Sequence, residues 1–224
     1  MKYLNIKKGK FISRPNRFIA HIEIDGRKEI CHVKNTGRCK ELLLSGATVF
    51  VQESDKAERK TKYDLISVLK GDMLINMDSQ APNKVMEEWL PKYFENITLI
   101  KPEAKYKNSR FDFYLEADGK KIFAEVKGVT LEENGVVMFP DAPTERGVKH
   151  LNELCECVKD GYEAYVFFVV QIEKADYFTP NRKTHPEFAD ALINAQKCGV
   201  NVYCINCIVK EDELTVKDFL KIIL

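Results

Sequence analysis

The stretch RFDFYLEADGKKIFAEVKG, from Arg110 to Gly128, restricts the fold of this chain more than any other segment. Asp118-Gly119 is a favoured pair for a two-residue type I′ turn, which joins two antiparallel strands. With that turn Ala117 faces Lys120, and every other facing pair is fixed. Because strand side chains alternate between two faces, the hairpin gains one apolar face. That face should carry Phe111, Phe113, Leu115, Ile122, Ala124 and Val126.

The other face of the hairpin is charged. Asp112 faces Glu125, and Lys127 lies two residues further on, opposite Arg110. Facing residues have Cβ atoms about 4.5–5.5 Å apart, and two carboxylates at about 5 Å repel by roughly 3 kcal/mol at an effective dielectric constant of about 20. A divalent cation between them would offset this repulsion, and hard oxygen ligands favour Mg²⁺ or Mn²⁺. The alternative is a solvated face on which Arg110 and Lys127 neutralise the acids.

Length and composition indicate an ordinary globular protein. The chain has 224 residues, of which 45% are hydrophobic and 31% charged, enough for one large domain or two small ones. We find no apolar run of membrane-spanning length and no secretory signal, so we expect no membrane partner and a cytoplasmic location. Seven cysteines without a signal peptide argue against a disulfide framework. Motifs for nucleotide hydrolysis, dinucleotide binding and zinc-protease chemistry are absent.

The pattern of predicted secondary structure changes near residue 80, where we expect the boundary between two domains. Before it, short strands with turn signals and a short helix at CKELLL suit a small β-barrel. After it, helices are expected over residues 84–94, 144–160 and 186–198, alternating with strands, which is typical of an α/β layer fold. Thr144 is the expected cap of the second helix. Residues 1–82 hold 16 Lys+Arg and 10 Asp+Glu, a mildly basic balance that suits phosphate contacts or an ordinary surface.

Several segments together resemble the sugar fermentation stimulation protein family, SfsA. They are HVKNTGRCKELL (32–43), SRFDFYLEADG (109–119), FAEVKGVTLEENG (123–135), FPDAPTERGVKHLNEL (139–154) and YVFFVVQ (165–171). The resemblance implies an α/β (α+β) chain of two domains. Residues 1–80 would form an OB-like small β-barrel, and residues 81–224 a PD-(D/E)xK restriction-endonuclease-like α/β domain. It also implies DNA binding and a regulatory label tied to sugar metabolism.

The resemblance assigns roles to the hairpin. Asp112 and Glu125 would hold Mg²⁺ or Mn²⁺, with the backbone carbonyl of Val126 as a further ligand. Lys127 would orient or deprotonate the attacking water, or pair with the phosphate. The proline that usually precedes the first acid is replaced by Phe111. One or two metal ions are possible, and the candidate accessory acids are Glu87, Glu88, Asp141 and Glu145.

Two further segments are candidates for contacts with nucleic acid. In TERGVKH the helix N-terminus and the side chains of Arg146, Lys149 and His150 would favour a phosphate, although a capped amphipathic helix is the alternative. The loop Asn35-Thr36-Gly37-Arg38 is either a plain turn or a loop whose Arg38 contacts phosphate or the second domain. Arg110 completes the set of candidate cations. Phe11, Phe18 and Phe50 are candidates for stacking on bases, and a place in the core is the favoured alternative for them.

Three functions follow from the sequence. The first is a metal-dependent nuclease, since Asp112, Glu125 and Lys127 stand in catalytic order. The second is a non-cleaving DNA-binding regulator of sugar metabolism genes, and the third is a metal-binding protein that acts on no nucleic acid. Carboxylates facing DNA are costly without a metal, which favours the enzyme. The sequence leaves open DNA or RNA, single or double strand, and the oligomeric state.

Overall fold

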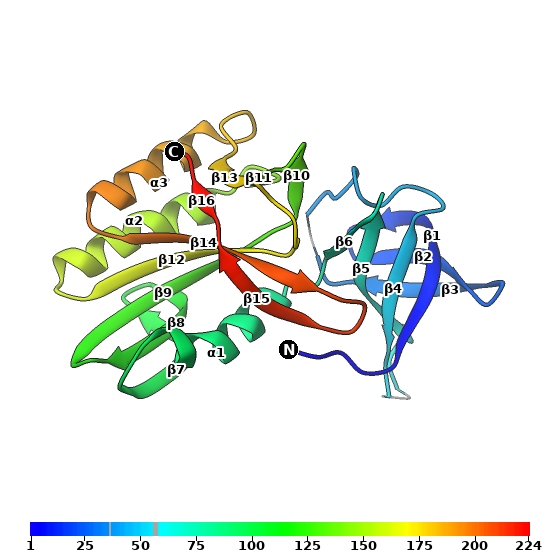
Figure 1. Ribbon diagram of the computed structural model, residues 1–224, viewed down its shortest axis with the longest axis horizontal. Helices are drawn as coiled ribbons and strands as arrows, with labels where there is room; N and C mark the ends of the chain where they lie inside the picture. The colour runs from blue at the N-terminus through cyan, green and yellow to red at the C-terminus, as the bar shows by residue number, and fades with distance from the viewer. Residues whose placement is uncertain (36, 56–57) are drawn as a thin grey trace.

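The N-terminal part of the chain is a closed β-barrel. The structure, a computed structural model, describes residues 1–35, 37–55 and 58–224. Six strands pair in the order β3-β2-β1-β4-β5-β6, and an additional β3–β5 pairing closes the barrel, which confirms the OB-like fold (Figure 1). The strands are β1 (Ile6–Asn16), β2 (Ile19–Ile24), β3 (Arg27–Val33), β4 (Thr48–Glu53), β5 (Tyr63–Lys70) and β6 (Met73–Asn76).

The short helix expected at CKELLL is wrong. The backbone N–H groups of Leu42 and Leu43 both donate to the carbonyl of Cys39 and make a single turn, and no helix is assigned there. One turn fixes several backbone angles for few hydrogen bonds, so it does not propagate without further helical residues. Gly46, with a φ of 84°, then leads into β4.

The C-terminal part is an α/β domain, as expected, built on a mixed six-stranded sheet in the order β15-β14-β12-β9-β8-β7 (Figure 1). Its strands are β7 (Ile97–Tyr106), β8 (Ser109–Ala117), β9 (Lys120–Val129), β12 (Glu163–Val170), β14 (Asn201–Val209) and β15 (Leu214–Phe219). A small second sheet contains β10 (Leu131–Glu133), β11 (Val136–Phe139), β13 (Tyr177–Pro180) and β16 (Lys221–Ile222). The sequence reasoning missed β7, β15 and the small sheet.

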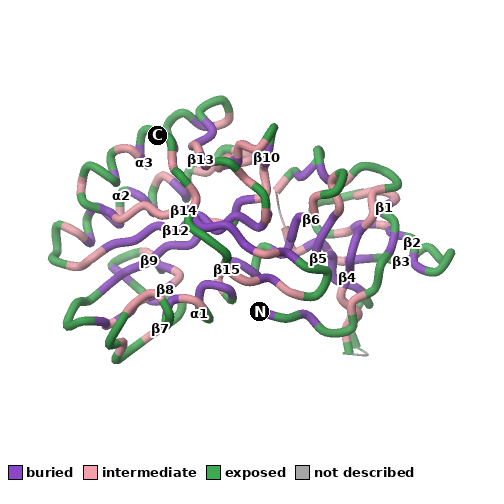
Figure 2. The backbone as a smooth tube through the Cα atoms, in the orientation of Figure 1, coloured by how far each residue is buried: buried purple, intermediate pink, exposed green. Residues whose placement is uncertain are grey.

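Helices cover both faces of the larger sheet. They are α1 (Ala81–Tyr93), α2 (Glu145–Lys159) and α3 (Pro186–Lys197). Leucines of α2 and α3 belong to one hydrophobic cluster, and the apolar side of α1 belongs to a second. Figure 2 shows the central strands buried between these layers. The predicted cap of α2 is confirmed, because the Thr144 side chain accepts from the backbone N–H of Gly147.

The predicted hairpin register is confirmed from the turn as far as Phe113 and Ala124. Asp118 and Gly119 have φ angles of 52° and 72°, as a type I′ turn requires, and Phe113 pairs with Ala124. The regular pairing ends at that pair. Phe111 is therefore not on the predicted face, because it contacts Phe123 on the α2 side while Phe113 packs on the α1 side.

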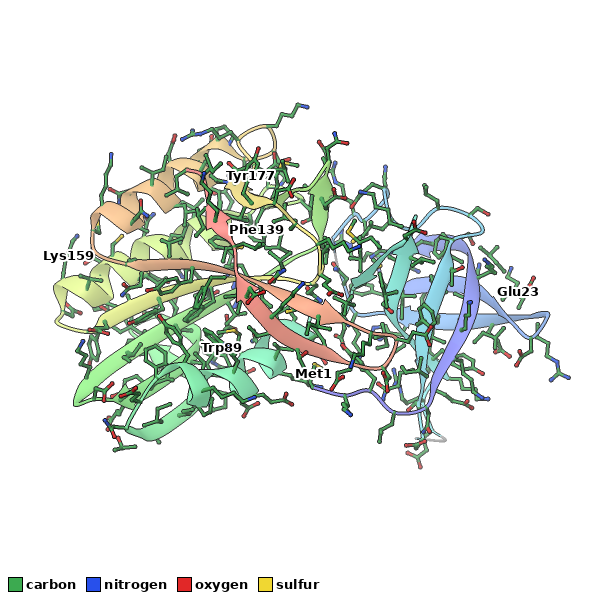
Figure 3. The ribbon with its side chains drawn as sticks, in the orientation of Figure 1. Met1, Glu23, Trp89, Phe139, Lys159 and Tyr177 are labelled. Atoms are coloured by element: carbon green, nitrogen blue, oxygen red, sulfur yellow. The ribbon has the colours of Figure 1, made fainter. Side chains whose placement is uncertain are left out.

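The two parts of the chain contribute to both hydrophobic clusters and share a buried polar junction. Gln171, just after β12, donates to Asn76 Oδ1 at 2.7 Å and to the carbonyl of Asp78 at 3.0 Å. The N-terminus reaches back across the molecule, where the ammonium of Met1 pairs with Glu88 of α1 at 2.7 Å (Figure 3). In the part of the chain that the structure describes, no helix is long and apolar enough to span a membrane.

Candidate functional site

Asp112 lies where β8 separates from β9. Its Oδ2 accepts from the backbone N–H of Val126 at 2.8 Å, so the side chain replaces the ladder bond that would come next. Its Oδ1 accepts from Asn83 Nδ2 of α1, also at 2.8 Å. Burial, followed by the negative charge of Glu125, raises the pKa of Asp112 above its ordinary value, and these two hydrogen bonds only partly oppose the shift.

Glu125 is buried in the middle of β9. Its Oε1 accepts from Lys127 Nζ and from His150 Nδ1, the latter at 2.5 Å. Burial alone would raise its pKa, but the hydrogen bond from His150 and the charge of Lys127 outweigh burial and lower it. The neighbouring environments thus push the pKa values of Glu125 and Asp112 in opposite directions, a pattern common to catalytic carboxylate pairs.

Two residues of α2, Arg146 and His150, hold Glu125 in place through successive hydrogen bonds. His150 Nε2 lies 3.3 Å from Arg146 Nε, which can only donate. Nε2 must then accept, and Nδ1 carries the proton that is donated to Glu125. Arg146 and His150 are four residues apart, so they lie on the same side of the helix. Arg146 therefore orients His150, and through it Glu125, and is not an unbound cation.

The two acids suit a hard divalent cation. Glu125 Oε2 is buried and has no hydrogen-bond partner among the described residues, which is costly for a carboxylate oxygen. Within the described residues no cluster of three or more His, Cys, Asp or Glu side chains could hold a metal. A cation would therefore rest on Asp112, Glu125 and backbone or water oxygens, as Mg²⁺ often does. The backbone carbonyl of Val126 stays a predicted further ligand, and the N–H of the same residue is taken by Asp112.

A hollow of about 190 Å³ lies between the two parts of the chain, where β9 ends. It is lined from the barrel side by Asn35 and Gly37 and from the other side by Gly128 and Gln171, among others. A Cβ at Gly128 would stand 2.7 Å from Gln171 Oε1 and 2.8 Å from Pro82 Cγ, so only glycine fits there. Gly128 follows Lys127 directly in β9, so the hollow begins one residue along the chain from the lysine.

The structure brings only some of the other candidate residues to this site. Asp141 lines the hollow and lies against Gly37. Glu87 is exposed on α1, one turn beyond Asn83, whereas Glu88 is taken by the N-terminus. The remaining four lie outside the acid pair: Glu145 is exposed near His185, Lys149 pairs with Glu153, Arg110 pairs with Glu103, and Arg38 belongs to a separate hollow on the barrel. Thr36 lies outside the described residues.

Sequence reasoning missed three residues that shape the site. Asn83 orients Asp112, Gln171 connects the junction, and Gly128 permits close approach. The glycine of AEVKG was a visible signal, because a glycine inside a strand often marks a close backbone approach. Nothing local in the sequence distinguishes Asn83 from other polar residues on a helix.

Comparisons with known proteins cover nearly the whole chain. The family models described as "SfsA N-terminal OB domain" and "Sugar fermentation stimulation protein RE domain" match residues 12–77 and 80–213. A sugar fermentation stimulation protein homolog of Clostridium beijerinckii is 62% identical, with 100% of each chain covered. One from Desulfitobacterium hafniense is 63% identical, covering 99% of this chain and 98% of the other. The structure of Pyrococcus furiosus SfsA in complex with Ca²⁺ has a TM-score of 0.90 at 28% identity, covering 100% and 98%.

Proposed function

This chain belongs to the sugar fermentation stimulation protein (SfsA) family, and we propose that it is a divalent-metal-dependent nuclease that hydrolyses phosphodiester bonds of DNA. The observation that carries the proposal is the unpartnered, buried Oε2 of Glu125 beside Asp112, whose pKa is raised. A divalent cation would give this oxygen a partner and would offset the repulsion between the two acids, which Lys127 and His150 relieve only at Oε1 of Glu125. The Ca²⁺ bound by the Pyrococcus furiosus relative supports a divalent ion.

The residues of the chain divide the work of hydrolysis. Asn83 and the Val126 N–H fix both oxygens of Asp112, and His150 fixes Glu125, so little reorganisation is needed when the site is loaded. A bound Mg²⁺ or Mn²⁺ would stabilise the charge that grows on the phosphate and would acidify a water molecule. Lys127 then has two roles open to it, holding the attacking water or neutralising a phosphate oxygen.

A regulator that only binds DNA is less well supported by the geometry. Two carboxylates, one of them with an orphaned oxygen, would repel a phosphate backbone, and such a protein gains nothing from keeping them. If the nuclease assay below shows DNA binding without cleavage, the non-cleaving regulator becomes the better explanation.

The decisive assay uses labelled single- and double-stranded DNA and RNA with Mg²⁺ or Mn²⁺. We expect wild-type protein to cleave at least one of them, EDTA to stop the reaction, and Glu125→Gln to lower the rate at least about 10³-fold, because a ligand and its charge are lost together. Glu116→Gln, on the same hairpin but outside the acid pair, is the matched control and should cleave like wild type. Salt-sensitive DNA binding without cleavage on any substrate would refute the nuclease.

A further inference from the structure

A second hollow lies on the barrel, near the junction with the α/β domain. Its volume is about 490 Å³, within the range of about 300–1,000 Å³ that accommodates a small molecule or a nucleotide-sized group. Its lining comes from the β1–β2 turn, from the loop after β3 and from Ala142, and consists of Arg14, Asn16, Arg17, Gly37, Arg38, Cys39, Lys40, Leu43 and Ala142. The lining includes four cations and no acidic side chain.

Arg14 builds the wall of this hollow. Its guanidinium donates to four backbone carbonyls, those of Arg17, Asn35, Gly37 and Arg38, at 2.6–3.1 Å. Four donors are thereby committed to the loops, and the buried Nε has no partner among the described residues. Arg14 therefore fixes the backbone from which the other cations project.

The remaining cations are free to meet a ligand. Arg17, Arg38 and Lys40 are exposed, and none of them makes an ion pair with a described residue. Burial, followed by the charges of Asp141 and Glu41, raises the pKa of the Cys39 thiol in the same lining. Because three unpaired cations surround a concave surface, the hollow favours an anion with several charges, such as consecutive phosphates.

An exposed aromatic ring follows the first of these cations in the β1–β2 turn. Phe18 follows Arg17 directly and is 51% exposed, whereas the other two stacking candidates, Phe11 and Phe50, are each only 4% exposed and belong to the core. The turn is well held, because Asn16 Oδ1 accepts from the Phe18 backbone N–H at 2.9 Å. Exposed aromatic rings next to cations are how OB barrels bind single strands, since an unpaired base can stack on the ring.

The two hollows are adjacent. Both are lined by Gly37, and the smaller hollow extends from it to Gly128, the residue after Lys127. Asp141 lies against Gly37, so a phosphate passing there meets one acid among the cations. A chain that occupied both hollows would run from the barrel to Gly128.

We propose that Phe18, Arg17, Arg38 and Lys40 form a binding site for single-stranded nucleic acid, which stacks a base on Phe18 and leads the strand past Gly37 to Lys127. The route to the acids rests on the proposed nuclease function, whereas the binding site itself does not. Duplex nucleic acid fits this site poorly, because its base faces are already stacked on one another.

The test measures fluorescence anisotropy of a labelled single-stranded oligodeoxynucleotide in EDTA, so that binding is separated from cleavage. Phe18→Ala should weaken binding about tenfold without changing its salt dependence. Arg38→Ala should lower the slope of log affinity against log salt by about 0.7, the value for one lost phosphate contact on a single strand. Matched controls are Phe219→Ala, since that ring is also 51% exposed, and Arg27→Ala, since that exposed cation begins β3 and pairs with Ile24, at the other end of β2 from Phe18.

The outcomes separate this inference from the nuclease. Binding by Phe18→Ala and Arg38→Ala that equals binding by their controls would overturn the inference, even if cleavage still depends on Glu125. Tighter binding of duplex than of single strand by wild type, with no loss in Phe18→Ala, would also overturn it. Loss of single-strand binding in both variants, with no cleavage by wild type in Mn²⁺, would support the binding site and refute the nuclease.

Discussion

Lys127→Ala should lower kcat for metal-dependent cleavage by about 10²–10³-fold, the usual cost of removing one charged group aimed at a developing charge. Its metal affinity should stay equal or become tighter. The Lys127 ammonium pairs with Glu125, and the Lys127 side chain is only 15% exposed. An incoming metal ion must therefore compete with Lys127 for the Glu125 carboxylate. Rate and metal affinity are thus predicted to move differently.

That divergence is what makes the experiment informative. If Lys127 merely stabilised the fold around Glu125, removing it would weaken metal binding and catalysis together. Lys121→Ala is the matched control, since Lys121 is an exposed lysine of the same strand. A Lys127→Ala protein that cleaves as fast as Lys121→Ala would remove Lys127 from the catalytic machinery.

Asp78→Ala should destabilise the protein by about 3–5 kcal/mol, because three donors lose a buried acceptor, and Lys34 keeps only its longer pair with Asp64, at 3.5 Å. Asp78 is fully buried at the junction. Its Oδ2 accepts from Lys34 Nζ at 3.2 Å and from the Tyr3 hydroxyl at 3.4 Å, and its Oδ1 accepts from the Gln80 N–H at 3.0 Å. Burial, together with the charge of Asp78, raises the pKa of Tyr3, so the phenol stays a donor.

Thermal unfolding measures this cost. A loss of this size corresponds to a fall in Tm of about 10 °C for a chain of this length. Asp72→Ala, an exposed acid of the same segment, should change Tm by less than about 2 °C. If Asp78→Ala and Asp72→Ala unfolded at the same temperature, the buried Asp78 would contribute no more to the stability of the protein than an exposed acid does.

The hairpin register could be predicted because its information is local. A two-residue turn at Asp118-Gly119 fixes which residues face each other, and the structure repeats that pairing as far as Phe113 and Ala124. Beyond that pair the interactions are tertiary. Asp112 turns to Asn83 and to the Val126 N–H, and the alternation that placed Phe111 with Phe113 breaks there.

Other errors have the same origin. Phe11, Phe18 and Phe50 are equivalent in the sequence, and only the closed barrel decides that Phe18 remains exposed. The sequence makes Glu88 a candidate accessory acid, but in the folded chain its carboxylate pairs with the ammonium of Met1. The edge strand β7 was missed because its side chains, mostly exposed, give no clean alternation.

The measurement that tests the account most directly is the Tm of wild type and Asp112→Asn, each in EDTA and in Mn²⁺. The folded-state pKa of Asp112 is raised, so the stability it contributes is present at acidic pH and is lost as pH rises through that pKa. At neutral pH the neutral amide should therefore raise Tm in EDTA.

Mn²⁺ should then reverse the order. Saturating metal at about 100 times its Kd adds roughly 2.7 kcal/mol to wild type, whereas Asp112→Asn, with a ligand charge lost, should gain almost nothing. This crossing of the two Tm values is the predicted result. An equal rise in Tm for both proteins on adding Mn²⁺, or no rise in wild type, would contradict a cation held between Asp112 and Glu125.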